Sequence, residues 1–563
     1  MIEQERGYLS ALNEAPFTAA DRMLVKHLRE DWGEKNQWIL LAAALCNLSI
    51  REGHAYFDLS TASPSVPFAA TEWPTLEQWH GILSKSAACS TSDDTASSPL
   101  VLADRSSLYL EKYYTFERRL SELIAGRIES SSVSGEDPVD RASQSHFFVI
   151  TGGPGTGKTT LALRYLDKLI ESWDGPRAAR FAAIAPTGKA AARLAESISG
   201  GVERMQVSEE RKQELLSIPC LTIHRLLGAL PHRSSFRANA QKPVRYDALV
   251  VDESSMIDLP LMMRLLEAVP HDCKLLLLGD KDQLTSVNVG SVFSDILDAS
   301  GTEDSALSGR VERLSKTYRF SEDSGIFRAC QLAREGNVKG FSEMLEEDLS
   351  DFEFSALSPQ QSRIPQKALS RAFRHWESLY ESESVESALA KLSRSMTLTP
   401  TRNGPNGSIE FNRRVLALAK KHLGHDPLQD RPLPASPIIV LENDYEVELF
   451  NGDVGLVWVD SHGSAFAYFQ AADGGTRKVL ISELPRFEPA FALTIHKSQG
   501  SEFDSVNCLF PAEPTSQVTR ELVYTAFSRA KKSVSVFSSA EALLTAIKTQ
   551  ANRATRLVNL LRT

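Results

Sequence analysis

A glycine-rich segment at residues 152–159 has the residue types and spacing of a phosphate-binding loop. Its sequence, GGPGTGKT, fits the pattern G-x-x-x-x-G-K-[ST], and it follows an apolar run and precedes a helical pattern. In such a loop the backbone amides and the helix dipole stabilise phosphate, Lys158 reaches the β- and γ-phosphates, and the Thr159 hydroxyl ligates Mg²⁺. The sequence therefore predicts a nucleoside-triphosphate site made of Gly152, Gly153, Pro154, Gly155, Thr156, Gly157, Lys158, Thr159 and Thr160.

Two acidic residues supply the partner that a phosphate-bound Mg²⁺ needs. Asp252 and Glu253 follow an apolar run in VVDESS; Asp252 would hold Mg²⁺ and Glu253 would polarise the attacking water. An acidic pair after a strand is also common as a helix N-cap, so this assignment depends on the phosphate loop. The next apolar run ends in LLLLGDKDQL, which places Asp280 and Gln283 where a side chain can sense the γ-phosphate, whereas Asp282 is equally compatible with a solvated turn.

Hydrolysis also needs cations near the charge that develops on the γ-phosphate. The candidates are Arg319 in LSKTYRF and Arg529 in LVYTAFSRAKKSV. The chain has 62 basic residues, and a single arginine is more often a surface charge, so the motifs around these two are what single them out.

Alternating strand and helix patterns must position these side chains. The apolar runs HFFVIT, RFAAIAP, YDALVVDE and CKLLLLGD alternate with helical segments, which predicts a parallel sheet with helices on both faces over residues 146–330. A weaker set, SMTLTP, FALTIHKSQG, SVNCLF and SVSVFSS, predicts a second α/β domain over residues 331–436 and 487–563. Residues 437–486 alternate with period two and carry the turn signals NG, HG and DGG, which predicts a small β-barrel insertion.

The chain before the first predicted sheet divides into two parts. Residues 1–125 carry apolar positions three and four apart, as in WILLAAALCNLSI, and predict a small, mostly helical domain. The Ser-, Asp- and Pro-rich stretch that follows predicts a linker over residues 126–145. The predicted fold class is therefore α/β, with two tandem α/β domains, a β-barrel insertion and a helical N-terminal domain.

Length and composition limit the class of protein. The 563 residues favour three or four domains, and 42% hydrophobic with 24% charged residues is typical of a folded globular chain. The 62 basic and 72 acidic residues give a net charge of −10, which is weak evidence against nucleic-acid binding, although this total is an average over a large surface. The six cysteines show no CxxC, so a zinc site or disulfide framework is unsupported. The N-terminus lacks a basic region followed by an apolar run, and we expect a cytoplasmic protein.

The motifs resemble, in order and spacing, those of superfamily 1 DNA helicases, and their wording is closest to the RecD branch, the alpha subunit of exodeoxyribonuclease V. The matching segments are GGPGTGKTT, APTGKAAARL, TIHRLLG, VVDESSMID, LLGDKDQL, LSKTYRF, LTPTRNGPNG, ALTIHKSQGSEFDSV and ELVYTAFSRAKKSV. The stretch SPLVLADRSSLYLEKYYTFERRL resembles the end of the family's N-terminal domain, which docks on partner subunits. The resemblance implies two RecA-like motor domains, an SH3-like insertion, ATP and Mg²⁺ as cofactors, and single-stranded and duplex-end DNA as ligands.

The resemblance also implies roles for single residues. It places Lys158, Thr159, Asp252, Glu253, Gln283, Arg319 and Arg529 in nucleotide hydrolysis, and Gly500 and Glu502 on the nucleotide side of the motor cleft. It places Thr187, Thr222, His224, Thr401, Thr494 and His496 where the family contacts single-stranded DNA. Each of the latter has another interpretation, because a threonine at a strand end is often a cap and a histidine can belong to the core.

Two further segments bear on unwinding and on base recognition. Residues 231–246, PHRSSFRANAQKPVRY, contain four Lys/Arg and no acidic residue, and they resemble the family's small hairpin that separates the duplex; a mobile surface loop is the alternative. The family usually has a glutamine well upstream of the phosphate loop that reads adenine, whereas Gln144 lies too close to Gly152 here.

Taken together, the resemblance implies an ATP-dependent 5′→3′ DNA helicase that works with RecB- and RecC-like subunits in a heterotrimeric helicase-nuclease of double-strand break repair and recombination. The sequence shows no nuclease constellation, so we expect nuclease activity to reside in a partner. One alternative is a stand-alone RecD-like helicase, which the absence of helix-hairpin-helix repeats in the first 125 residues disfavours. Another is a nucleotide-binding scaffold subunit without motor activity, which the intact candidate residues disfavour.

Overall fold

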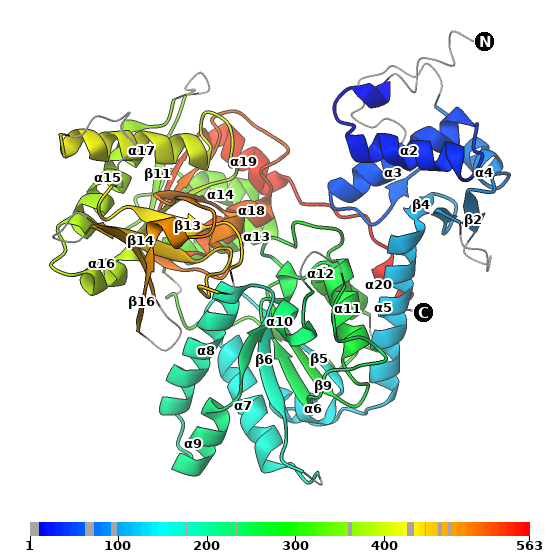
Figure 1. Ribbon diagram of the computed structural model, residues 1–563, viewed down its shortest axis with the longest axis horizontal. Helices are drawn as coiled ribbons and strands as arrows, with labels where there is room; N and C mark the ends of the chain where they lie inside the picture. The colour runs from blue at the N-terminus through cyan, green and yellow to red at the C-terminus, as the bar shows by residue number, and fades with distance from the viewer. Residues whose placement is uncertain are drawn as a thin grey trace.

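The computed structural model describes residues 11–61, 73–91, 98–175, 177–230, 235–302, 305–321, 323–358, 363–424, 433–444, 446–459, 464–470 and 475–562. Within these ranges the chain forms four sheets and the helices that cover them (Figure 1). In this part of the chain, none of the helices combines the length and the apolar character that crossing a membrane requires.

The first α/β domain is built on a parallel sheet in the order β10-β5-β9-β8-β6-β7. Successive residues of a strand point to opposite faces, so Leu275 and Leu277 of β9 join one core while Leu276 and Leu278 join the other. Burial on both faces explains why these strands are continuous apolar runs, and the predicted parallel sheet is confirmed. The strands are β5 (Phe147–Gly152), β6 (Phe181–Ala185), β7 (Cys220–Thr222), β8 (Ala248–Val251), β9 (Lys274–Gly279) and β10 (Val311–Leu314).

Helices cover both faces of this sheet (Figure 1). One face packs against α6 (Pro138–Gln144), α7 (Lys158–Glu171), α8 (Gly188–Glu203) and α9 (Glu209–Leu216). The other packs against α5 (Glu111–Glu129), α10 (Ile223–Leu227), α11 (Leu259–Ala268) and α12 (Val292–Ala299).

The second α/β domain also has a parallel sheet, in the order β11-β20-β19-β12-β18. Its strands are β11 (Phe352–Ala356), β12 (Ser395–Thr399), β18 (Ala492–Thr494), β19 (Phe503–Leu509) and β20 (Ala530–Ser538). One face packs on α13 (Gly325–Glu335), α14 (Val338–Met344), α18 (Arg520–Phe527) and α19 (Ala540–Lys548), and the other on α15 (Gln366–Tyr380) and α17 (Ser408–His422), with α16 (Val385–Leu392) against α15. This domain begins earlier than the predicted boundary at residue 331, because Ile326, Ala329 and Cys330 of α13 belong to its core.

The insertion is an antiparallel sheet in the order β16-β15-β14-β13-β17. Its strands are β13 (Pro437–Val440), β14 (Val454–Val459), β15 (Ala465–Gln470), β16 (Thr476–Leu480) and β17 (Phe487–Pro489), so the last one lies just beyond the predicted end at residue 486. Its side chains form a core of their own, which includes Ile438, Val457 and Phe469. The predicted HG and DGG turns lie wholly or partly outside the described residues.

The N-terminal domain contains the predicted helices, but it also contains a small sheet. The helices are α2 (Ala19–Glu30), α3 (Gln37–Arg51) and α4 (Leu76–Leu83), and the strands are β1 (Phe57–Asp58), β2 (Cys89–Thr91), β3 (Leu100–Leu102) and β4 (Ser107–Leu110), in the order β1-β4-β3-β2. Strands this short carry too few residues for a period-two pattern, so sequence periodicity did not predict them.

Helix α5 joins the N-terminal domain to the first α/β domain and crosses the predicted boundary at residue 125. Its buried Arg127 donates hydrogen bonds to carbonyls at and beyond the end of α11, including those of Val269 at 2.5 Å and Pro270 at 2.7 Å. The last carbonyls of a helix lack intrahelical donors, and a cation there is also favoured by the helix dipole. The predicted linker 126–145 therefore starts inside a packed helix, and it also holds α6, which Asp137 caps.

The C-terminal strap, residues 549–562, leaves the second α/β domain and returns to the first. Its short helix α20 (Leu557–Leu560) packs against α12 and α5, and Figure 1 places the C-terminus beside α5. The strap therefore differs from the prediction, which assigned it to the second domain. All six cysteines are free, and the described residues contain no group of three or more His, Cys, Asp or Glu side chains that could hold a metal ion.

Candidate functional site

The phosphate loop connects β5 to α7 and has a backbone that only glycine adopts readily. Gly155 and Gly157 have φ angles of +73° and +89°, in the left-handed region. Gly155 also needs to lack a side chain, because a Cβ there would lie 2.4 Å from the Cβ of Arg319. Lys158 Nζ donates to the carbonyls of Gly152 at 2.6 Å and Gly153 at 3.1 Å, so the lysine lies over the loop.

The remaining predicted loop residues continue this arrangement. Thr156 is buried and its hydroxyl donates to the Gly153 carbonyl at 2.8 Å. Thr159 and Thr160 follow Lys158 in the first turn of α7, where Thr160 is exposed. The loop therefore lies at the N-terminus of α7, which favours anions.

The segment after β10 lies directly on the phosphate loop. The Tyr318 amide donates to the Gly155 carbonyl at 2.8 Å, and the Thr317 hydroxyl donates to the Pro154 carbonyl at 3.4 Å. The Tyr318 side chain is 75% exposed, and its ring lies 3.9 Å from where a Cβ at Gly157 would be. This segment places Arg319 beside the loop.

The Arg319 guanidinium belongs to a group of ion-paired side chains, the most highly charged contact of the site. We call this group the Glu502 cluster, and its members are Glu502, Arg193, Arg319 and Lys531. Arg319 Nη2 pairs with one carboxylate oxygen of Glu502, Arg193 Nη2 pairs with the other, and Lys531 Nζ lies 3.7 Å away. Arg193 belongs to α8 of the first α/β domain, whereas Glu502 precedes β19 of the second. The cluster therefore bridges the two domains beside the phosphate loop.

The surroundings of Glu502 keep it ionised. Its side chain is 11% exposed, and burial alone raises the pKa of a carboxyl, but the Arg193 and Arg319 guanidiniums outweigh burial and lower the pKa of Glu502 to about 2. The turn before it contains Gly500, at a φ of +69°, and packs against Ala190 of α8, 3.6 Å from the position of a Gly500 Cβ. Gly500 and Glu502 thus lie where the second α/β domain meets α8 of the first.

Two buried polar atoms near the loop have no hydrogen-bond partner among the described residues: Arg319 Nη1 and Gln283 Oε1. An unpaired buried polar atom is costly, so its persistence calls for a ligand or water. The first is a cationic donor, which suits a phosphate oxygen, and the second is an acceptor, which suits a water or hydroxyl. This donor set fits a nucleoside triphosphate.

The acidic pair lies at the end of β8. The Asp252 amide donates to the Ile184 carbonyl at 2.8 Å, and the Glu253 amide donates to Asp252 Oδ1 at 2.9 Å. Burial and the neighbouring Glu253 carboxylate raise the pKa of Asp252, while Lys158 and Arg193 act in the opposite direction. Glu253 has a left-handed φ of +51°, a costly conformation for a residue other than glycine and one that occurs preferentially at functional sites.

Gln283 belongs to a second bridge between the domains. Its Nε2 donates to Asp280 Oδ2 at 3.0 Å, and Tyr524 of α18 donates to the same oxygen at 2.8 Å. One residue further on, the Leu284 amide donates to Thr525 Oγ1 at 2.9 Å. Sequence reasoning did not assign roles to Tyr524, Thr525 or Arg193, although all three lie inside quoted motifs.

Arg529 is fully buried within the second domain. Its guanidinium donates to the Thr525 carbonyl at 3.1 Å, to the Ser501 carbonyl at 3.4 Å and to Ser528 Oγ at 3.2 Å. Burial lowers its pKa, and the charge of Glu253 counters that shift. Arg529 therefore supports the turn that carries Glu502, and its charge acts on the same cleft.

The residues predicted to contact DNA form two groups at the carboxyl ends of the two sheets. Thr187 caps α8 and Thr222 caps α10, accepting from the amides of Ala190 at 3.2 Å and Arg225 at 3.1 Å. Their strands, β6 and β7, are neighbours. Both threonines are therefore helix caps, which was the alternative interpretation. A hydroxyl that caps a helix remains able to contact a DNA strand.

In the second group, Thr401 follows β12, and Thr494 ends the adjacent strand β18. Thr401 donates to the Asn403 carbonyl at 3.0 Å, and Thr494 accepts from the Lys497 amide at 3.3 Å.

The two candidate histidines divide between these groups. The ring of His224 lies 5.7 Å from that of Phe236, and His496 follows β18. Burial lowers the pKa of both imidazoles, which favours their neutral form.

The predicted pin at 231–246 is described in part. Residues 231–234 lie outside the described ranges, but the flanking residues Ala229 and Phe236 pair as antiparallel strands do, and Asn239 and Lys242 exchange two backbone hydrogen bonds of 3.1 Å. Gln144, at the end of α6, accepts from the Ser134 amide at 3.0 Å, so its amide is held by a local contact.

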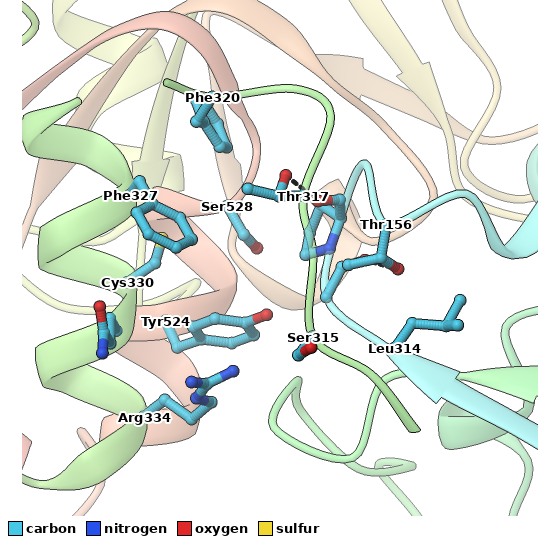
Figure 2. Close-up of a pocket in the computed structure, with 13 residues that line it drawn as sticks. Thr156, Leu314, Ser315, Thr317, Phe320, Phe327, Cys330, Arg334, Tyr524 and Ser528 are labelled. Carbon is cyan, nitrogen blue, oxygen red and sulfur yellow. Dashed lines mark hydrogen bonds between the residues drawn. The ribbon is translucent and has the colours of Figure 1, made fainter. Parts of the chain in front are cut away.

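A pocket of about 520 Å³, including its opening to solvent, lies between the phosphate loop and the second domain. Figure 2 shows Phe327 and Arg334 of α13 and Tyr524 of α18 facing Ser315 and Thr317 across it. The two domains therefore do not close completely on each other beside the loop.

Comparison with known proteins agrees with this geometry. The family model described as "RecBCD enzyme subunit RecD, N-terminal domain" matches residues 14–109, an AAA domain model matches residues 136–289, and a UvrD-like helicase C-terminal domain model matches residues 489–537. The phosphate loop and the bridged α/β domains define a P-loop motor of the helicase class.

Several relatives match along most of their length. The chain is 33% identical to the RecBCD enzyme subunit RecD of Mycobacterium tuberculosis, covering 98% of this chain and 96% of the relative, and 32% identical to that of Mycolicibacterium smegmatis, covering 94% of each. A solved Pif1 helicase chain is 16% identical, with a TM-score of 0.39, over 75% of this chain and 95% of that one. The chain belongs to the RecD family, and it is an ATP-dependent DNA helicase of the RecBCD type.

The Glu502 cluster gives a first prediction. Glu502→Gln removes the charge that holds Arg193 and Arg319, so we expect the kcat of DNA-stimulated ATP hydrolysis to fall about tenfold or more, as when an arginine finger is displaced. The matched control is Lys531→Ala, which removes a half-exposed contact of 3.7 Å and should leave kcat within about twofold. Equal rates for Glu502→Gln and wild type would contradict the role of the cluster.

The lowered pKa of Glu502 also predicts how the activities of wild type and Glu502→Gln depend on pH. Because the pKa of Glu502 is lowered to about 2, its stabilising contribution is fully present above the unfolded-state value of about 4.3 and is lost as the pH falls from there toward 2. We therefore expect the activity ratio of wild type to Glu502→Gln to stay constant between about pH 6 and pH 9.

Proposed function

We propose that ATP hydrolysis in the cleft between the two α/β domains drives this helicase along single-stranded DNA in the 5′→3′ direction. The observation that supports a cleft motor most strongly is the Glu502 cluster, in which one carboxylate of the second domain holds Arg193 of the first domain and Arg319 of the connecting segment. A nucleotide that draws Arg319 toward its phosphates changes this bridge, so nucleotide state and domain separation are coupled.

The residues of this chain divide the work of hydrolysis. The phosphate loop and Lys158 hold the phosphates, and Thr159 with Asp252 would hold Mg²⁺, which supplies charge neutralisation between phosphate oxygens. Glu253 orients and deprotonates the attacking water. Arg319 stabilises the charge on the γ-phosphate through its unpaired Nη1, with Arg529 contributing from behind it.

Base binding falls to a residue that the sequence did not single out. Tyr318 presents an exposed ring beside the first turn of α7, and Lys316 lies 5.3 Å from its centre. A planar aromatic face next to the phosphate loop suits stacking on a purine. This platform accounts for base binding without Gln144.

DNA would run across the carboxyl ends of both sheets. Thr187, Thr222 and His224 grip it on the first domain, and Thr401, Thr494 and His496 grip it on the second. Such contacts are directed at the backbone and are sequence-tolerant. The basic segment 231–246, which contains four Lys/Arg, would form the pin that separates the duplex.

The domain layout suggests how the motor is used. The N-terminal domain would dock on RecB- and RecC-like subunits, the two α/β domains would be RecA-like motors, and the insertion would be an SH3-like barrel. The relatives at 32–33% identity are named RecBCD enzyme subunits, which supports a heterotrimeric helicase-nuclease acting on DNA ends in double-strand break repair, in the cytoplasm where bacterial DNA lies. The stand-alone alternative is less well supported, because the match to the RecD2 helicase of Deinococcus radiodurans covers 70% of this chain, whereas the matches to the RecBCD subunits of Mycobacterium tuberculosis and Mycolicibacterium smegmatis cover 98% and 94% of it.

Polarity is tested with partial duplexes that carry one single-stranded tail. We expect the purified chain to unwind a 5′-tailed duplex with ATP at least about tenfold faster than a 3′-tailed one, as a single direction of travel requires. A blunt duplex of equal length serves as the control for end-independent melting. Preference for the 3′ tail would overturn the direction and leave the ATPase assignment intact.

Assembly is tested by affinity purification of the tagged chain from its native cells. We expect RecB- and RecC-like subunits to be recovered in equal molar amounts, as measured by mass spectrometry and native mass. A variant that lacks residues 1–110 should recover neither, because it lacks the docking domain. A monomer with full processive unwinding would instead support the stand-alone helicase.

A further inference from the structure

The C-terminal strap carries the chain from the second α/β domain back to the N-terminal domain. The Ala554 amide donates to His54 Nδ1 at 2.9 Å, and the Ala55 amide donates to the Ala554 carbonyl at 2.8 Å. Figure 1 shows the strap running from α19 toward α20 and α5. The end of the motor is thus bonded to residues 52–55, the turn that follows α3.

Arg553 on this strap joins two other parts of the molecule. Its Nη1 donates to the Glu52 carbonyl at 2.8 Å, and its Nη2 donates to the Ser286 carbonyl at 3.2 Å. The guanidinium lies so close to Gly53 that a Cβ there would be 0.7 Å from Nη1. Gly53 is therefore the residue that admits Arg553 between the N-terminal domain and the first motor domain.

Ser286 belongs to the loop 284–290, which directly follows Gln283. At its start, the Leu284 carbonyl accepts from Gln499 Nε2 of the second domain at 3.1 Å. At its end, the Gly290 amide donates to the Gly53 carbonyl at 2.9 Å. The loop that begins beside the ATP site is thus held by the second motor domain at one end and by the N-terminal domain at the other, with Arg553 between them.

We propose that Arg553 is a positioning residue for ATP hydrolysis, which couples the place of the N-terminal domain to Gln283 through the loop 284–290. When the N-terminal domain shifts, Gly53 and Glu52 shift with it, and the bidentate guanidinium passes the displacement to Ser286. Because Gln283 is joined directly to Leu284 and lies three residues before Ser286, a displacement of this stretch moves the Gln283 Oε1 relative to the phosphate loop. The hydrolysis rate thereby depends on how the N-terminal domain is held.

This inference rests on the ATPase activity and on neither the polarity nor the partners proposed above. It predicts that Arg553 affects turnover more than nucleotide binding, because the hydrogen bonds of its guanidinium within the described part of the chain go to Glu52 and Ser286 and not to the phosphate loop or Tyr318. A small displacement of a group near the reacting atoms costs rate steeply.

The test compares the purified full-length chain with Arg553→Ala, using Arg562→Ala as the matched control. Arg562 lies on the same strap and donates to the Asp298 carbonyl at 2.8 Å, away from the loop 284–290. We expect Arg553→Ala to lower the kcat of DNA-stimulated ATP hydrolysis at least about fivefold with the KM for ATP within about twofold. Arg562→Ala should keep kcat within about twofold, and Arg553→Lys should recover part of the loss because it retains one charged donor.

A double-mutant cycle with Gly53→Ala distinguishes coupling from general destabilisation. At Gly53 the φ of +91° strains an alanine and the new methyl group must also displace the guanidinium, so the variants are compared at equal fraction folded. Under that condition Gly53→Ala should lower kcat like Arg553→Ala, and the double variant should lose no more than either single one. Additive losses, or an Arg553→Ala kcat equal to that of Arg562→Ala, would overturn the proposal. If the wild-type chain itself shows no DNA-stimulated hydrolysis, the helicase assignment fails instead.

Discussion

The organisation of this protein depends on one buried carboxylate, Glu502, held between Arg193 and Arg319. A charge taken out of water is costly unless it is paired on all sides, and here each carboxylate oxygen has its own guanidinium. Buried ion pairs contribute little net stability, but breaking one by removing a partner is expensive, so they fix geometry well. The cluster therefore sets the distance between the two domains at the phosphate loop.

The same contact explains how the cleft can respond to a nucleotide. Arg319 pairs with Glu502 through Nη2, and its buried Nη1 has no partner among the described residues. Arg319 can therefore bind a phosphate through Nη1 while Nη2 stays paired with Glu502 of the second domain. Asp280 makes a parallel link, because Gln283 and Tyr524 share one of its oxygens. Two side-chain bridges thus connect groups beside the nucleotide to α8, α18 and the turn before β19, and the strap extends this coupling to the N-terminal domain.

Sequence patterns predicted the features that depend on neighbouring residues in the chain, namely the strands and the phosphate loop. The strands of both α/β domains are apolar because they are buried on two faces. The phosphate loop is recognisable in the sequence because its backbone has positive φ angles, which require glycines. The partners in the site were harder to predict, since Arg193 and Glu502 are 309 positions apart and nothing near either one specifies the other. The strap, the strands of two to four residues and the course of α5 were missed for the same reason, because tertiary packing determines them.

In the proposed mechanism ATP is hydrolysed at the phosphate loop, and DNA controls the rate. The most direct measurement is the steady-state ATPase rate of wild type and Lys158→Ala, with and without single-stranded DNA, at equal melting temperature. We expect strong DNA stimulation in wild type and a loss of at least about 100-fold in the variant, since the role proposed for the lysine is to contact the transferred phosphoryl group. Unchanged hydrolysis by a folded Lys158→Ala chain would contradict it.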